Sequence, residues 1–212
     1  MATNRRLAKI SDTDYDFYPT PAWGTKALLY YEKFEGSVDE ICCGEGDISD
    51  VLKDEGYKVN SSDLIDRGYG KQQDFLKQTK RMQNVCTNPP FNIANEIVLK
   101  AIALTDRKIC MLLRTAFLES ATRYNVIFKN NPPVRVYTFC ERLSMYKRTK
   151  KGVVSTKGGG TTAYSWFVWD NSVKIKETQL FWIKPGFKPN ARRKKVKQSF
   201  HFSPVRNKKR NK

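Results

Sequence analysis

Short apolar runs alternate with amphipathic segments along most of this chain, and the alternation limits the folds that it can adopt. Short segments that contain apolar residues predict strands at 37–43, 57–63, 84–87, 108–113, 133–139 and 163–170. Helical spacing of apolar residues predicts helices at 21–34, 48–57, 71–82, 91–104 and 117–130. Thr20 is the expected N-cap of the first helix, with Pro21 at the first helical position. Strands that alternate with helices favour an α/β fold with a mostly parallel sheet and helices on both faces.

The composition supports one folded domain. The chain has 212 residues, of which 40% are hydrophobic and 12% aromatic, and this apolar surface can offset the entropy lost on folding. No stretch approaches the roughly 20 apolar residues that span a bilayer, and residues 1–10 lack the apolar run of a secretory signal. We therefore expect a cytoplasmic protein without a membrane partner. The oligomeric state is left open by the sequence.

The positive charge is concentrated at the end of the chain. Lys and Arg number 39 against 21 Asp and Glu, which gives a net charge of +18. Residues 188–212 contain eleven basic residues and no acidic residue, and so supply +11 of that charge. This composition divides the chain into a lead-in at 1–17, a domain at 18–187 and a mobile basic tail at 188–212. A polyanion such as DNA or RNA suits such a tail, and a purely solubilising tail explains the charge equally well.

The cysteines and the histidine give little support for a metal site. The five cysteines lie mostly in apolar runs and lack the paired spacing of zinc ligands. His201 is the only imidazole in the chain. We therefore expect buried, reduced thiols and catalysis without a metal.

Two glycines follow the first predicted strand. Ligands bind open parallel sheets outside the carboxyl ends of the strands, so residues in these positions are the ones to examine for chemistry. Gly44 and Gly46 let the chain turn tightly and let backbone N–H groups approach a ligand. A third glycine at the dinucleotide spacing and a Gly-Lys-Ser/Thr sequence are both absent, which disfavours pyrophosphate and triphosphate sites.

Acidic residues follow the next two segments. Asp63 ends the second predicted strand, 23 residues after Glu40, and an acid in this position can accept both hydroxyls of a ribose. A solvated loop aspartate is the simpler alternative. Asp74 and Phe75 can bind an exocyclic amine and pack against a purine. Together with the glycine turn, these positions favour an adenosine-like ligand.

The most informative residues follow the strand at 84–87, where the sequence reads Asn88-Pro89-Pro90-Phe91. Two prolines fix the backbone and remove two N–H donors, so the nearby carbonyls meet no local competition. The Asn88 amide oxygen and the Pro89 carbonyl can then accept both protons of one planar amine and make its lone pair available for attack. Phe91 offers a face on which a base can stack. A proline-stiffened turn explains the prolines but not the asparagine and the phenylalanine.

In this order the four segments resemble the class I S-adenosylmethionine-dependent methyltransferases. Within that family the chain is most similar to small phage and bacterial DNA adenine-N6 methyltransferases with an Asn-Pro-Pro-Phe motif. The resemblance covers roughly residues 17–170 and departs from the family pattern at Cys42, where glycine is usual. It implies a single Rossmann-like domain, a seven-stranded sheet whose last strand is antiparallel, and a location in a bacterial or phage-infected host cell.

The resemblance also implies S-adenosylmethionine as cofactor and assigns residues to each part of the site. The catalytic residues are Asn88, Pro89, Pro90 and Phe91. The segment at 16–21 resembles the family segment that contacts the methionine end of the cofactor. The cofactor contacts that it implies are Tyr18, Thr20, Pro21, Glu40, Cys42, Gly44, Gly46, Asp63, Asp74 and Phe75.

A base in duplex DNA reaches such a pocket only after it is flipped out of the stack, at a cost of a few kcal/mol. Binding contacts must offset that cost. The basic segment at about 141–161 lies between two predicted strands and is the expected recognition element, although an ordinary solvated hairpin is the alternative. Its candidate nucleic-acid contacts are Arg142, Lys147, Arg148, Lys150, Lys151 and Lys157.

Four alternatives to DNA adenine methylation stay open. RNA adenine methylation uses the same motif, and A-form helices and single strands also attract basic tails. Enzymes that methylate glutamine in a protein usually have an Asn-Pro-Pro-Tyr motif. Enzymes that methylate the N4 amine of cytosine more often have another residue where Asn88 stands. A nucleic-acid-binding protein on a decayed methyltransferase scaffold would not need the intact motifs. Cytosine-C5 methylation is disfavoured because the chain lacks a Pro-Cys pair.

Overall fold

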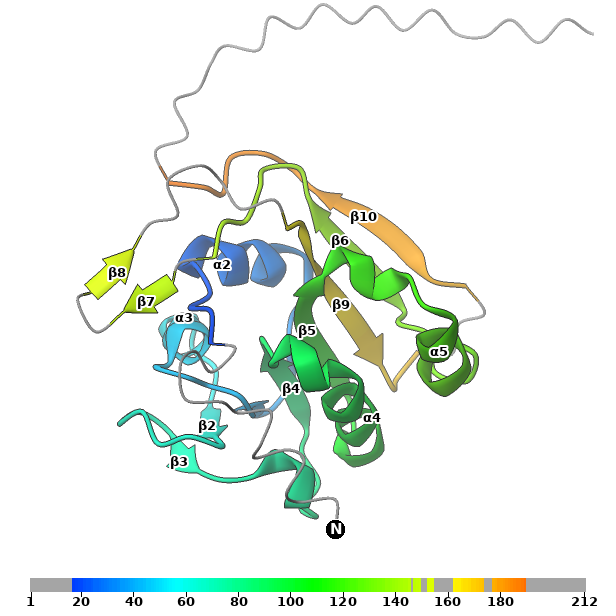
Figure 1. Ribbon diagram of the computed structural model, residues 1–212, viewed down its shortest axis with the longest axis horizontal. Helices are drawn as coiled ribbons and strands as arrows, with labels where there is room; N and C mark the ends of the chain where they lie inside the picture. The colour runs from blue at the N-terminus through cyan, green and yellow to red at the C-terminus, as the bar shows by residue number, and fades with distance from the viewer. Residues whose placement is uncertain (1–16, 146, 150–151, 155–161, 174–176, 190–212) are drawn as a thin grey trace, which may run out of the picture.

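The computed structural model describes residues 17–145, 147–149, 152–154, 162–173 and 177–189 (Figure 1). Residues 1–16 of the lead-in and residues 190–212 of the basic tail lie outside the described residues, and so do Lys150, Lys151 and Lys157 of the basic segment.

An eight-stranded sheet forms the centre of the protein, in the order β10-β6-β9-β5-β4-β1-β2-β3 (Figure 1). Strand β9 is antiparallel to both of its neighbours, and the other neighbouring strands are parallel. The mostly parallel sheet is therefore confirmed, but the expected number of seven strands is wrong. The strands are β1 (Val38–Glu40), β2 (Val59–Asp63), β3 (Lys71–Gln72), β4 (Asn84–Thr87), β5 (Lys108–Arg114), β6 (Arg135–Phe139), β9 (Tyr164–Asp170) and β10 (Gln179–Ile183).

Strand β10 is the eighth strand, and the sequence did not predict it. It lies at the edge of the sheet and pairs in parallel with β6, so the antiparallel β9 is not the last strand of the sheet. Ile183 is buried, whereas Leu180 and Trp182 are 46% and 67% exposed. A strand that buries one residue of five lacks the alternation by which a half-buried strand is recognised in a sequence.

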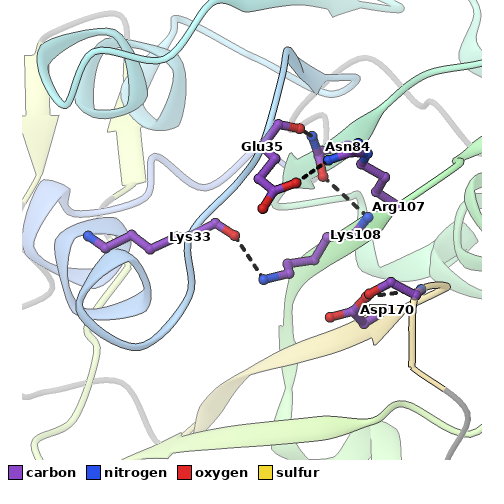
Figure 2. Close-up of a pocket in the computed structure, with 7 residues that line it drawn as sticks. Lys33, Glu35, Asn84, Arg107, Lys108 and Asp170 are labelled. Atoms are coloured by element: carbon purple, nitrogen blue, oxygen red, sulfur yellow. Dashed lines mark hydrogen bonds and ion pairs between the residues drawn. The ribbon is translucent and has the colours of Figure 1, made fainter.

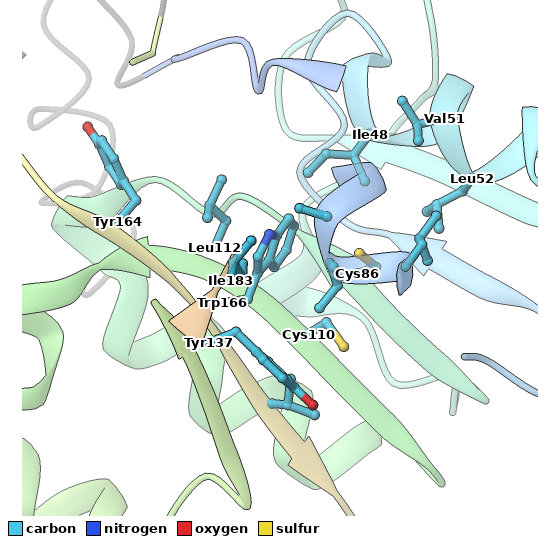
Figure 3. Packing of buried hydrophobic residues seen from close by; sticks show 14 of the residues in the cluster. Ile48, Val51, Leu52, Cys86, Cys110, Leu112, Tyr137, Tyr164, Trp166 and Ile183 are labelled. Carbon is cyan, nitrogen blue, oxygen red and sulfur yellow. The ribbon is translucent and has the colours of Figure 1, made fainter. Parts of the chain in front are cut away.

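Two apolar clusters cover the two faces of the sheet. The first contains residues of α2 (Ala22–Tyr31) and α3 (Asp47–Asp54), and Figure 3 shows part of it around Trp166. The second contains residues of α4 (Ala94–Leu104) and of the segment 115–128. Alternate residues of β5 divide between the clusters, because successive side chains of a strand point to opposite faces. Helices therefore cover both faces, as the sequence predicts.

Two of the predicted helices are replaced by shorter structures. In place of the helix at 71–82 lie β3 and the single turn η1 (Phe75–Lys77), which Asp74 caps by accepting a hydrogen bond from the Leu76 N–H at 3.0 Å. Local side-chain bonding of this kind competes with a continuing helix. In place of the helix at 117–130 lie η3 (Thr115–Leu118), α5 (Ala121–Arg123) and the π-helical turn η4 (Tyr124–Phe128). Ser120, with φ of 146°, interrupts this segment.

The first helix begins at Ala22, one residue later than expected. Its N-cap is Pro21, and no side chain makes a capping hydrogen bond there. The predicted capping role of Thr20 is therefore wrong, and its hydroxyl bonds to a distant side chain instead. Within the described part of the chain, no helix is long and apolar enough to cross a membrane.

Candidate active site

The carboxyl ends of three adjacent parallel strands place the predicted site residues at one edge of the sheet. Strand β1 pairs with β2 on one side and with β4 on the other. The chain leaves β1 through residues 43–46, which we call the glycine loop. Gly44 and Gly46 have φ values of 55° and 92°, in the left-handed region that glycine tolerates best.

Asp63 joins the end of β2 to the glycine loop. Its Oδ2 accepts a hydrogen bond from the Gly44 N–H at 2.8 Å, and its Oδ1 accepts one from the Ile65 N–H at 3.0 Å. Each carboxylate oxygen has two lone pairs, so each can accept one further hydrogen bond. The carboxylate is half-buried and held in a fixed orientation with acceptor capacity to spare.

Aromatic rings pack directly on both glycines of the loop. A Cβ atom at Gly44 would overlap the ring of Phe17, and one at Gly46 would overlap the ring of Tyr69. The guanidinium carbon of Arg67 lies 4.3 Å from the centroid of the Phe17 ring. Close approach of the backbone therefore requires glycine at both positions, independently of their φ values.

Glu40 is more enclosed than a ligand contact at the loop surface would be, whereas Cys42 is half-buried. Glu40 is 2% exposed, and its carboxylate accepts a hydrogen bond from the Ser49 hydroxyl of α3. Burial raises the pKa of Glu40 well above its usual value, against the opposing effect of Ser49. Burial likewise raises the pKa of the Cys42 thiol, which favours its protonated form. Glu40 thus connects β1 to α3 beneath the loop.

Asp74 and Phe75 follow β3 in the chain, and the turn η1 that they begin packs against α4. The Asp74 carboxylate is occupied by the cap of η1 and by an ion pair with Lys77 at 3.7 Å. Phe75 is 4% exposed and belongs to the second apolar cluster. Most of the Phe75 ring therefore packs on other protein atoms, and only its margin is open to a ligand.

Asn88, which directly follows β4, has one satisfied and one unsatisfied end of its amide. Its Nδ2 donates to the backbone carbonyl of Tyr18 and to Oγ1 of Thr20, each at 3.1 Å. Its Oδ1 is buried and has no hydrogen-bond partner among the described residues. The sequence predicted Asn88, but it gave no sign of these two partners, which lie 70 and 68 residues earlier.

Phe91 lies in a group of aromatic and cationic side chains from distant segments. Its ring centroid is 5.9 Å from that of Tyr18 and 5.7 Å from that of Tyr164, with interplanar angles of 25° and 32°. The guanidinium carbon of Arg114 lies 4.7 Å from the Phe91 centroid. Sequence reasoning missed Arg114 and Tyr164, although both stand at strand ends and are paired in register between β5 and β9.

The proposed recognition segment is described only in part. Arg142 is exposed and precedes a two-stranded antiparallel hairpin of β7 (Lys147–Thr149) and β8 (Gly152–Val154). The backbone of Lys147 and Arg148 belongs to β7, and their side chains lie outside the described part of the structure.

A pocket of about 350 Å³ lies at the opposite edge of the sheet (Figure 2). It includes Asn84 and Lys108, which begin β4 and β5, and Asp170, which ends β9. Charged groups at its wall are paired with one another, as in the ion pair between Arg107 and Glu35. Because Asn84 begins β4 and Asn88 follows its other end, this pocket is separate from the Asn88 site. Among the described residues, no group of three or more His, Cys, Asp and Glu side chains could hold a metal ion.

Comparison with known proteins finds similarity in structure alone. No protein-family model matches the sequence, and no curated protein matches it. A candidate class I S-adenosylmethionine-dependent methyltransferase from Listeria monocytogenes aligns with a TM-score of 0.58 and 15% identity, over 85% of this chain and 71% of that one.

Two further solved structures are similar to the chain. A candidate RNA methyltransferase from Pyrococcus horikoshii has a TM-score of 0.57 and 14% identity, over 76% of this chain and 90% of that one. The modification subunit of a candidate type I restriction enzyme from Vibrio vulnificus has a TM-score of 0.54 and 11% identity, over 90% of this chain and 51% of that one. The chain thus has the Rossmann-like fold of S-adenosylmethionine-dependent methyltransferases.

Proposed function

We propose that the protein transfers a methyl group from S-adenosylmethionine to the N6 amine of adenine in DNA. The amide of Asn88 carries this proposal, because its nitrogen has two acceptors whereas its buried oxygen has no donor among the described residues. An unsatisfied buried acceptor costs about 1–3 kcal/mol. A base whose amine donates to Oδ1 would remove that cost, so the free oxygen suits an exocyclic amine.

The residues at 88–91 can activate such an amine without an acid–base residue. The lone pair of a purine amine is delocalised into the ring, which makes the nitrogen a poor nucleophile. If Asn88 Oδ1 and the Pro89 carbonyl each accept one N–H, they favour a pyramidal nitrogen with a localised lone pair. Pro89 and Pro90 have no N–H groups that would compete for these acceptors.

Phe91 would hold the plane of the base. A base stacked on an aromatic side chain is stabilised by about 1–3 kcal/mol. Phe91 is half-buried, and its contacts with Tyr18 and Tyr164 fix the orientation of its ring. A purine would therefore stack on the part of the Phe91 ring that Tyr18, Tyr164 and Arg114 leave open.

The glycine loop and Asp63 would hold the cofactor. Each Asp63 oxygen uses one lone pair on a backbone N–H and retains one, which suits the two hydroxyls of a ribose. When bound, S-adenosylmethionine supplies an electrophilic methyl group on a positively charged sulfur, which is a good leaving group. The protein's own contribution is to hold the amine in line with that group.

RNA is the second candidate substrate. The Pyrococcus horikoshii structure is named as a candidate RNA methyltransferase, and the Vibrio vulnificus structure as the modification subunit of a candidate type I restriction enzyme. The net charge of +18 suits either polyanion. We favour DNA because the order of the sequence motifs resembles that of DNA adenine-N6 enzymes.

Methyl transfer to nucleic acid tests the proposal directly. Purified protein is incubated with labelled S-adenosylmethionine and with duplex DNA, single-stranded DNA or RNA, and the digested nucleosides are analysed by mass spectrometry. We expect N6-methyladenine in DNA. Label in RNA alone would establish the second candidate, and no methylated adenine in any polymer would overturn the proposal.

Asn88→Ala should lower turnover by about 100-fold or more, the usual effect of removing one hydrogen-bonding group that acts on the transition state. Asn92→Ala is the matched control, because Asn92 is exposed in the neighbouring turn η2 (Phe91–Ile93). Its turnover should stay within about twofold of the wild type. Equal turnover for the two variants would remove Asn88 from its proposed role.

A further inference from the structure

Thr20 is a buried hydroxyl residue whose expected roles do not account for its position. It is 3% exposed and makes no capping bond to the helix that follows it. The resemblance to the methyltransferases implies a contact with the cofactor. In the structure, its Oγ1 instead lies 3.1 Å from Nδ2 of Asn88.

We propose that Thr20, together with the backbone carbonyl of Tyr18, positions Asn88 for the reaction by fixing which way round its amide lies. The two ends of an asparagine amide are nearly the same in shape, but only the oxygen can accept a proton from the target amine. An inverted amide would present its NH2 group to that amine, and two donors would then face each other. This inference rests on the proposed function, since it assigns the cause of the orientation that the function requires.

The surroundings of Nδ2 select the productive orientation. The Tyr18 carbonyl can only accept, so an inverted amide would place Oδ1 against another oxygen at 3.1 Å without a proton between them. The Thr20 hydroxyl could also donate to an inverted Oδ1, so the Tyr18 carbonyl makes the choice, and Thr20 holds that orientation by accepting the second N–H of Nδ2. With both N–H groups directed toward the 18–20 segment, Oδ1 is the only polar atom of the side chain left for a substrate.

The 18–20 segment is anchored firmly enough to hold the Asn88 amide in one orientation. Pro19 and Pro21 flank Thr20 and are both buried, and each fixes its own φ angle. The Tyr18 ring stacks on Phe91. At the start of α2, the Gly24 carbonyl accepts a hydrogen bond from the indole N–H of Trp166 in the core, at 3.0 Å. The segment therefore has little freedom to follow Asn88 if the amide turns.

Substitutions at position 20 distinguish this role from a cofactor contact. Thr20→Val keeps the shape but removes the acceptor, whereas Thr20→Ser keeps the hydroxyl. We expect Thr20→Val to lower kcat about tenfold with the Kd for S-adenosylmethionine unchanged, and Thr20→Ser to restore kcat. A normal kcat in Thr20→Val, or a weakened Kd with kcat unchanged, would overturn the proposal.

Thr25→Val is the matched control, because it also replaces a buried threonine with valine, within the helix α2 that follows Thr20. Thr25 is fully buried in α2, and its hydroxyl has no hydrogen-bond partner among the described residues. Its substitution should therefore leave kcat unchanged. If Thr25→Val lowers kcat as much as Thr20→Val does, the loss is a packing effect and the proposal fails.

A measurement without turnover separates this inference from the proposed function. The side-chain amide of Asn88 can be assigned in the ¹⁵N NMR spectrum as the signal that Asn88→Ala removes. In the wild type both of its protons should be protected from exchange with water, and in Thr20→Val one of them should lose that protection. Unprotected protons in the wild type would overturn the positioning role, even if methyl transfer is observed. If no methyl transfer is found, the exchange measurement still tests whether Thr20 positions the Asn88 amide.

Discussion

Asn88 and Asp63 are polar side chains whose orientations are set by backbone groups. Asp63 accepts from the Gly44 and Ile65 N–H groups, and Asn88 donates to the Tyr18 carbonyl. Backbone groups are held by the sheet and the loops around them, so these side chains are in position before a ligand arrives. The proposed chemistry depends on such prior alignment, because methyl transfer to an amine needs orientation more than it needs acid–base catalysis.

For single residues, we predict that Asp63→Asn weakens the binding of S-adenosylmethionine about tenfold or more. Asparagine has one acceptor oxygen, so either the Gly44 or the Ile65 N–H loses its partner, and one ribose hydroxyl would meet an NH2 group. Calorimetry with S-adenosylmethionine measures the change. Asp66→Asn is the control, since exposed Asp66 makes a similar turn bond to the Gly68 N–H. Equal affinities in both variants would contradict the ribose assignment.

The sequence predicted where the site residues stand but not how their side chains are held. Asp63 was found because it ends a predicted strand, and Asn88 because it follows one, and the ends of parallel strands meet at one edge of a sheet. The capping role expected for Thr20 was wrong because a tertiary partner, Asn88, takes its hydroxyl. A bond across 68 residues leaves no local pattern in the sequence.

Among the elements, the glycine loop and α3 act together, since Gly46 is both the second glycine of the loop and the N-cap of the helix. We predict that Gly46→Ala destabilises the protein more than Gly56→Ala does. Both glycines have positive φ, of 92° and 86°, so the backbone strain is similar. A Cβ at Gly46 overlaps the Tyr69 ring, whereas a Cβ at Gly56 meets nothing within 4 Å.

Chemical denaturation of the two variants gives the comparison. The difference in unfolding free energy should be about 1–3 kcal/mol, the usual effect of overpacking. Tyr69→Ala in the Gly46→Ala background should recover part of it, because the clash is then removed. Equal losses at positions 46 and 56 would show that Tyr69 yields freely to the added methyl group.

A buried ion-pair network joins α2 to β5 and β6. Glu32, which directly follows α2, is 3% exposed and accepts hydrogen bonds from Lys108 at 2.6 Å, from Tyr137 at 2.8 Å and from Arg135. Burial by itself would raise the pKa of Glu32, but the bonds from Arg135, Lys108 and Tyr137 together outweigh it and lower the pKa below 4.5. The network thus favours the charged carboxylate in the folded protein.

We predict that Glu32→Gln lowers the unfolding free energy by about 3 kcal/mol at pH 7. Lys108 and Arg135 are largely buried and would lose their bonds to a charged carboxylate, while Arg135 would keep its ion pair with Asp170 at 3.0 Å. The folded-state pKa of Glu32 is lower than its unfolded value, so its stabilisation is present above pH 4.5 and is lost as the pH falls through the folded pKa. The variant should therefore lose less stability than the wild type on acidification.

Denaturation curves at pH 7 and at several acidic pH values test both statements. Glu35→Gln is the control, because Glu35 pairs with Arg107 but its side chain is 86% exposed. An exposed pair contributes about 0–1 kcal/mol. Parallel pH profiles for the wild type and Glu32→Gln would contradict the assignment of the network.

Element by element, strongly apolar or strongly periodic segments were predicted correctly and weakly buried ones were not. Strand β5 was evident because Ile109–Leu113 are all buried. The helix expected at 71–82 failed because Phe75 is the only residue between 71 and 77 that is buried, so tertiary packing gives no helical face to stabilise. Strand β10 was not predicted for the same reason, because Ile183 is the only buried residue of the strand.

For the whole molecule, the uneven charge gives a prediction about binding. Removing residues 190–212 deletes ten basic residues and no acidic one. The affinity for DNA should then depend less on salt, with the slope of log K against log salt reduced by about 0.9 for each phosphate that the tail neutralises in the wild type. Titrations of a fluorescent duplex at several salt concentrations give the slope.

A tail of equal length with glutamine in place of each Lys and Arg is the control for this deletion, since it removes charge without shortening the chain. It should show the same reduced slope. If both forms keep the wild-type slope, the tail is only solubilising and the phosphates are bound within the domain.

Strand β10 also determines where the chain can be cut or joined to another protein. Five residues of β10 pair with β6, Ile183 is 1% exposed, and Phe187 packs on the first cluster and meets Tyr30 with ring centroids 5.6 Å apart. A break before Gln179 would strip a border strand from the sheet and uncover its neighbour. A fusion partner or affinity tag can therefore be attached after Pro189 with the packed body intact, but not upstream of Phe187.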